Sequence, residues 1–165
     1  MNLDDWTLLV LLSGSIIILT AFVSILARHK FRGSFAIAVA SVLGIFAGVG
    51  GASHGPGEIL QGNVPPSGII IQAWPALTLL AGEPAMTLVP SFSISGILTV
   101  ITGVAVTIWA PTRIQSKNGA LILILLSMTM LFVGGGLIPP AFGVVAGIIG
   151  LRIRKRNLKT TRQKV

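Results

Sequence analysis

Residues 119–151 read GALILILLSMTMLFVGGGLIPPAFGVVAGIIGL, a run of 33 residues without a charged side chain. As one helix this run would be about 50 Å long, whereas the hydrocarbon core of a bilayer is about 30 Å thick. Three glycines and two prolines interrupt it between Gly134 and Pro140. Glycine weakens a helix through backbone entropy, and proline lacks the amide donor. The pattern therefore predicts a hairpin of two membrane-spanning helices, at about 119–136 and 139–156.

The composition of the whole chain agrees with a membrane protein. Of the 165 residues, 53% are hydrophobic and 10% are charged, whereas a soluble domain averages about 25% charged residues. This balance excludes an ordinary soluble domain and a disordered chain. The sequence contains no cysteine, which excludes disulfides, thiolate metal sites and a cysteine nucleophile. The fold class that we predict is all-α, a single polytopic bundle of transmembrane helices over residues 1–165.

Three further apolar runs predict spans at about 6–27, 33–53 and 88–110, which makes five spans in total. With the N-terminus outside, all 12 Lys and Arg residues fall on the cytoplasmic side, and Asp4, Asp5, Glu58 and Glu83 fall outside. Four spans would place the basic tail outside, against the positive-inside rule. The charges thus predict a multi-pass protein of the cell membrane with a cytoplasmic C-terminus.

A long extracytoplasmic loop is predicted between the second and third spans, at residues 54–87. Within it, the stretch 69–81 is apolar but carries Gln72 and Pro75, and it is short for a membrane span. We interpret it as an interfacial segment or a small cap on the outer surface. A re-entrant segment or a true span are the alternatives.

Small and hydroxyl residues recur at every fourth position along the predicted spans. Such positions share one helix face, and small residues let membrane helices approach closely. The predicted packing residues are Ala36, Ala40, Gly44, Gly48 and Ala52 in the second span, Ser95, Thr99 and Gly103 in the third, and Gly143 and Gly147 in the last. They predict packing within the chain; a surface for a homo-oligomer or a membrane partner, or a polar pore along the third span, are the alternatives.

The polar residues that could bind a ligand gather in the predicted outer loop. The candidate ligand or metal residues are His54, Glu58, Gln61, Asn63 and Glu83. His54 and Glu58 are four residues apart, yet the intervening Gly-Pro-Gly is expected to break a helix there. The apolar runs hold no ionisable residue, which argues against a proton-coupled transporter. The sequence contains no recognisable nucleophile or phosphate motif, so we expect no catalytic residue and no cofactor.

The basic tail at 152–165 is expected to fix the topology and to contact anionic lipid headgroups. Its first cationic residues are Arg152, Arg154, Lys155 and Arg156. A tail this short, without aromatic residues, does not favour nucleic acid as a partner.

The residues 84–90 (PAMTLVP), the stretch 123–136 ending in Gly-Gly-Gly, and Pro139-Pro140 resemble those of small bacterial multi-pass membrane proteins. This resemblance implies no functional family, activity or cofactor. We therefore expect a small membrane protein that acts as an accessory, assembly or interaction subunit. The alternatives are a small oligomeric channel or carrier for uncharged solutes, and a metal-binding, cofactor-binding or enzymatic protein that uses His54 and Glu58.

Overall fold

The computed structural model describes residues 35–74, 77–78 and 82–162, with side chains described as far as Ile153. The predicted first span, 6–27, and the acidic N-terminus lie outside the described residues. The described part of the chain is mostly helical. Its elements are α2 (Phe35–Ala52), α3 (His54–Leu60), β1 (Ile70–Ile71), β2 (Ala85–Met86), α4 (Phe92–Arg113), α5 (Gly119–Phe132) and α6 (Ile138–Arg162).

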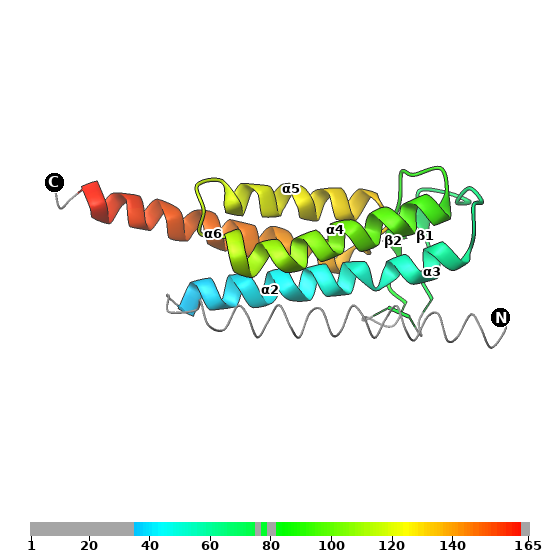
Figure 1. The fold of residues 1–165 in the computed structure, drawn as a ribbon, viewed down its shortest axis with the longest axis horizontal. Coiled ribbons are helices and arrows are strands. Elements are labelled where there is room, and N and C mark those ends of the chain that lie inside the picture. Colours follow the sequence, from blue (N-terminus) through cyan, green and yellow to red (C-terminus); the bar gives the residue numbers. More distant parts are fainter. Residues whose placement is uncertain (1–34, 75–76, 79–81, 163–165) are drawn as a thin grey trace.

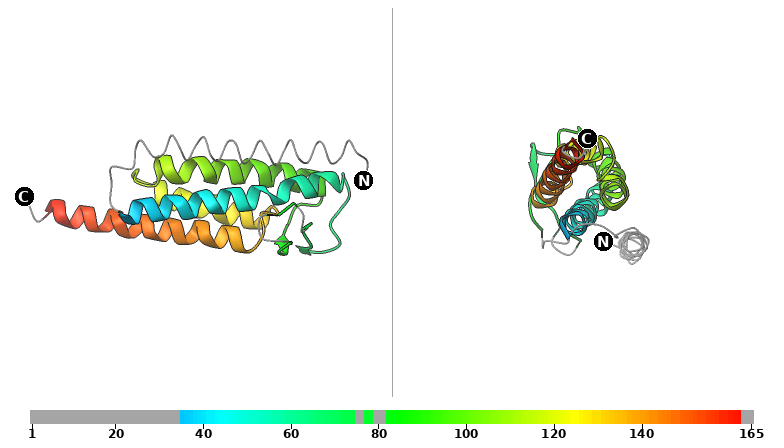
Figure 2. Two further views of the ribbon diagram at one scale, coloured as in Figure 1. Left: turned by 90° about the horizontal axis from the view of Figure 1, so that it is seen from below. Right: turned by 90° about the vertical axis from the view of Figure 1, so that its left-hand side faces the viewer.

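The long helices lie side by side along the long axis of the molecule (Figure 1), and the end-on view in Figure 2 shows them as a bundle. Helix α2 packs against α4 and α6, and α5 packs against the same two helices. Helix α6 runs past the others toward the C-terminus. Helix α3 and the two strands lie at the opposite end of the bundle, which we call the α3 end.

Within residues 35–74, 77–78 and 82–162, two helical segments are long and apolar enough to cross a membrane. They are the continuous stretch Phe35–Leu60, which joins α2 and α3, and helix α4. The apolar helices Gly119–Phe132 and Ile138–Ile153 are shorter. By length and composition the chain is thus suited to membrane association, while the arrangement of five spans stays a prediction.

The segment 54–60 is helical, so the prediction that it belongs to an irregular loop broken by Gly-Pro-Gly is wrong. Pro56 lies in the first turn of α3, where a missing amide donor costs little. Gly55 packs against α4: a Cβ atom at this position would lie 2.6 Å from the carbonyl oxygen of Gly96. Close packing against α4 therefore holds the segment helical where local propensity predicts a break.

The rest of the predicted loop forms a small cap rather than a spanning helix in its described part. Strands β1 and β2 pair antiparallel, with Ile70 opposite Met86 and Ile71 opposite Ala85. After β2 the chain contacts the end of α5, because the amide of Leu88 donates to the carbonyl oxygen of Phe132 over 2.9 Å. These two short strands and a single β-bridge between Thr87 and Val133 depart from the all-α prediction.

The hairpin of α5 and α6 has different limits from those predicted. Helix α5 ends at Phe132 rather than at 136, and α6 begins at Ile138. The glycines form the turn, with positive φ angles at Gly134 and Gly136 that other residues rarely adopt. The two prolines belong to the first turn of α6, where proline is tolerated.

The small residues lie mainly at helix interfaces within the chain. Cβ atoms added at Gly44 and Gly48 would lie 2.3 Å from the Cβ atom of Ala110 and 2.5 Å from the carbonyl oxygen of Gly103, both on α4. A Cβ at Gly147 would lie 2.9 Å from the carbonyl oxygen of Ala120 on α5. The fully buried positions of the predicted set also include Ala40, Ala52, Ser95 and Thr99, whereas Ala36 is half-buried. The bundle is thus held by close backbone contacts.

Candidate functional site

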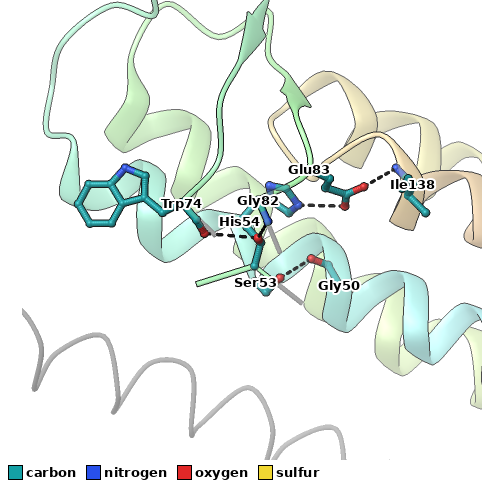
Figure 3. Close-up of polar contacts among 8 residues, drawn as sticks. Gly50, Ser53, His54, Trp74, Gly82, Glu83 and Ile138 are labelled. Carbon is teal, nitrogen blue, oxygen red and sulfur yellow. Dashed lines mark hydrogen bonds and ion pairs between the residues drawn. The ribbon is translucent and has the colours of Figure 1, made fainter. Parts of the chain in front are cut away.

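A buried pair of ionisable side chains joins three elements at the α3 end. His54 Nε2 lies 3.2 Å from Glu83 Oε1, and the two residues are 3% and 8% exposed. The second carboxyl oxygen of Glu83 accepts a hydrogen bond of 3.1 Å from the backbone amide of Ile138. Figure 3 shows this path from α3 through Glu83 to the first residue of α6. Glu83 therefore links α3, the segment before β2 and α6.

The beginning of α6 suits a carboxyl group. The first amides of a helix lack intrahelical acceptors and carry a partial positive charge. Pro139 and Pro140 have no amide hydrogen, so Ile138 supplies the donor at this terminus. Burial raises the pKa of Glu83, and the hydrogen bond from Ile138 acts in the opposite direction.

A second carboxyl group lies one helical turn along α3. Glu58 is 3% exposed, and neither of its oxygens has a hydrogen-bond partner among the described residues. It faces the turn between α5 and α6, because a Cβ atom added at Gly134 would lie 2.5 Å from Glu58 Oε2. A buried carboxylate without a partner is costly, so this group requires a proton, a cation or water.

The nearest hydroxyl group does not supply that partner. Ser95 on α4 lies near Glu58 but donates its single hydroxyl hydrogen to the carbonyl oxygen of Val133 over 2.6 Å. Thr99 donates to the same carbonyl oxygen, also over 2.6 Å. Thr87 Oγ1 lies 2.7 Å from Ser95 Oγ, and because the Ser95 hydrogen is committed, Thr87 is the donor. These hydroxyl groups fix the turn over Glu58. Ser95 approaches the carboxyl group of Glu58, but no hydrogen bond of normal length joins the two among the described residues.

The glycine turn completes the site. A Cβ atom at Gly136 would lie 2.6 Å from both His54 Nε2 and Glu83 Oε1, and one at Gly134 would collide with Glu58. Both residues also have positive φ angles, of 77° and 114°. The turn can therefore approach all three ionisable side chains only as glycine.

The structure brings some of the predicted site residues together and separates others. His54, Glu58 and Glu83 surround the glycine turn. Gln61 instead donates to the carbonyl oxygen of Gly57 at the end of α3, over 3.2 Å. Asn63 accepts from the hydroxyl of Ser91, the N-cap residue of α4, over 2.6 Å. These two amides support local backbone structure.

Several parts of the site were not predicted from the sequence. They are the amide of Ile138, the hydroxyl groups of Thr87, Ser95 and Thr99, and the close approach of the glycine turn. Three consecutive glycines at 134–136 were interpreted only as a helix break, although glycine also permits close approach to buried side chains. No group of three or more His, Asp and Glu residues among those described is arranged to hold a metal ion.

The cationic residues of the tail lie at the other end of the bundle. Arg152 on α6 is exposed. The side chains of Arg154, Lys155 and Arg156 lie outside the described part, although α6 includes their backbone. Contact of this segment with lipid headgroups stays a prediction.

Comparison of the chain with models of known protein families, with curated proteins and with solved structures gives no significant match.

Proposed function

We propose that the chain is a five-span protein of the cell membrane that binds a proton at its outer end and acts as a small proton-coupled carrier. In this arrangement the α3 end faces outward and the basic tail is cytoplasmic. The observation that carries the proposal is Glu58, a carboxyl group that is 3% exposed and has no hydrogen-bond partner among the described residues. Ionisable groups buried in a membrane bundle are costly, and they commonly mark proton or ion pathways.

The position of Glu58 changes one premise of the sequence-based case against proton coupling. From the sequence, His54 and Glu58 were expected in the outer loop 54–87, and the apolar runs were expected to hold no ionisable residue. Both residues instead belong to the continuous helical stretch Phe35–Leu60, which is apolar enough to cross a membrane. A proton is the smallest ligand that neutralises a buried carboxylate, and it needs no further coordinating side chain.

The other functions expected from the sequence have less support from the geometry. The small-residue faces of α2 and α4 contact each other, so an accessory subunit would need a different surface for its partner. The hydroxyl groups of Ser95, Thr99 and Thr107 donate to backbone carbonyl oxygens rather than lining an open path. A pore for uncharged solutes along α4 would require these bonds to break.

Infrared difference spectroscopy tests proton binding directly. The full chain is purified in lipid nanodiscs, and spectra are recorded as the pH is changed from acid to alkaline. We expect a carboxylic C=O band that disappears as the pH rises and that is absent from Glu58→Gln. The same band should persist in Glu83→Gln, the matched control. A spectrum in which Glu58→Gln loses no band would overturn the assignment of the proton to Glu58.

Charge movement tests the carrier role. Proteoliposomes adsorbed on a solid-supported membrane receive a rapid change of external pH, and the resulting current is recorded. We expect a current from the native chain and from Gly68→Ala, whose added methyl group meets no atom within 4 Å. Glu58→Gln should abolish the current. Equal currents from native chain and Glu58→Gln would overturn the proposal and leave the accessory subunit as the favoured function.

A further inference from the structure

A small cavity lies beside α3, on the side of the segment 71–74. Its volume of about 10 Å³ is close to the space that one buried water molecule needs. Four of its lining side chains are polar: His54, Glu58, Gln61 and Gln72. Gln72 and Trp74, which also line the cavity, are exposed residues, so this side of the cavity borders the surface of the protein.

Two of these polar side chains have buried atoms without partners. They are Nδ1 of His54 and both carboxyl oxygens of Glu58. Leaving a buried polar atom unsatisfied costs about 1–3 kcal/mol, and a buried water typically makes two to four hydrogen bonds to such atoms. The cavity thus has the size for one water molecule, and both side chains that carry these unpartnered atoms line it.

We propose that this cavity is a binding site for a single water molecule through which protons pass between the outer solution and Glu58. The inference rests on the proposed function, because it requires that Glu58 changes its protonation state. The inference adds the route by which a proton reaches Glu58 from the outer solution, which the contacts of Glu58 alone do not define.

The proton transfer involves one bond at each partner. A protonated water in the cavity loses an O–H bond, a carboxylate oxygen of Glu58 gains one, and a neutral water remains. Release reverses these steps. In the described part of the chain, the titratable groups around the glycine turn beside Glu58 are His54 on α3 and Glu83 in the segment before β2. Helix α4 presents the uncharged Ser95, and the turn at 133–137 has no titratable side chain.

Gly57 gives a mild way to fill the cavity. A Cβ atom added there would lie 3.5 Å from Leu77 Cδ1 and 3.9 Å from Trp74 Cβ, which are ordinary van der Waals distances. Gly57→Ala should therefore fold, and alanine also favours the helix. The added methyl group projects toward Trp74, which lines the cavity with Gly57, and reduces the space for water. Gly68→Ala is the matched control, since that methyl group meets open space.

The readout is the rate at which the carboxylic band of Glu58 forms after a rapid drop of pH, measured by time-resolved infrared spectroscopy in nanodiscs. We expect Gly57→Ala to slow this rate about tenfold, the effect of losing one bridging hydrogen bond of about 1.4 kcal/mol. Gly68→Ala should leave it unchanged. As a second variant, Gln72→Leu removes a polar group from the exposed wall and should slow the rate as well.

The outcomes separate this inference from the proposed function. A Glu58 band that forms at the native rate in both Gly57→Ala and Gln72→Leu overturns the water route and leaves proton binding intact. Absence of any Glu58 band in the native chain overturns both. Unfolding of each variant in detergent is measured in parallel, so that a slowed rate is interpreted only for a chain of native stability.

Discussion

The body of the bundle and its α3 end bury polar groups in different ways. In the body, Thr107 and Ser127 donate to carbonyl oxygens of their own helices over 2.9 and 2.8 Å. The hydroxyl of Ser41 differs, because it has no hydrogen-bond partner among the residues that the structure describes. At the α3 end, His54, Glu58 and Glu83 are buried, and Glu58 has no hydrogen-bond partner within the described part of the chain. The body is thus built for close packing, whereas the α3 end retains groups whose charge state can change.

The largest effect is expected in the body, at the contact between α2 and α4. A side chain at Gly48 would lie 2.5 Å from both the carbonyl oxygen of Gly103 and the amide nitrogen of Thr107. Because both neighbours are backbone atoms, the helices would have to separate. Gly48→Val should lower the free energy of unfolding by about 3 kcal/mol, measured by unfolding in mixed detergent micelles. Gly68→Val serves as the control, and equal stability of the two variants would contradict the packing described here.

The second prediction links the glycine turn to Glu58. Gly134→Ala adds a Cβ atom that would lie 2.5 Å from Glu58 Oε2, at a φ angle of 114°. We expect a loss of about 2 kcal/mol, part from backbone strain and part from the collision. Glu58→Ala removes the carboxyl group. In the double variant it should therefore restore the part of the free energy of unfolding that was lost to the collision, but not the part lost to backbone strain. A double-mutant cycle should then give a coupling energy of about 1 kcal/mol, and purely additive losses would show that the turn does not press on the carboxyl group.

The third prediction concerns Glu83 and pH. Burial raises the pKa of Glu83, so the folded chain binds this proton more tightly than the unfolded chain. The resulting stabilisation is fully present below the unfolded pKa of about 4.3, and it is lost as the pH rises through the folded value. His54 is the ionisable group that Glu83 contacts. The stability of the native chain relative to Glu83→Gln should therefore fall as the pH increases. A difference that grows with pH would mean that the pairing with His54 and Ile138 outweighs burial.

The sequence predicted the body of the bundle better than its α3 end, for a physical reason. Apolar runs and helix breakers are local signals, and they predicted the helical class and the break between α5 and α6. The four-residue spacing of Gly44 and Gly48 predicted a face that packs closely, because helical periodicity alone places these residues together. The ends of α5 and α6 depend on the geometry of the turn between them, which the sequence pattern does not specify. The predicted end of α5 was therefore four residues too late, at 136 rather than Phe132.

The α3 end depends on contacts between distant parts of the chain. Gly55-Pro56-Gly57 forms a helix because α4 packs against it, and no local propensity indicates this. His54 and Glu83 are 29 residues apart, and Glu83 and Ile138 are 55 residues apart. Polar residues on an apolar chain identified the candidates His54, Glu58 and Glu83. The hydrogen bonds that Gln61 and Asn63 make to Gly57 and Ser91 follow only from the fold.

The smallest effect is expected at Asn63. Substituting this residue tests whether its side chain only supports the local backbone or also belongs to the site around Glu58. Asn63 accepts a hydrogen bond from Ser91, which caps α4 by accepting from the amide of Ile94. Asn63→Ala should cost about 0.5–1 kcal/mol of stability, because one partly buried hydrogen bond is lost while the cap itself remains. The carboxylic infrared band of Glu58 should be unchanged. A shifted band would place Asn63 in the same hydrogen-bond network as Glu58. The group of residues that influence Glu58 would then extend farther along the loop after α3 than the hydrogen bonds indicate.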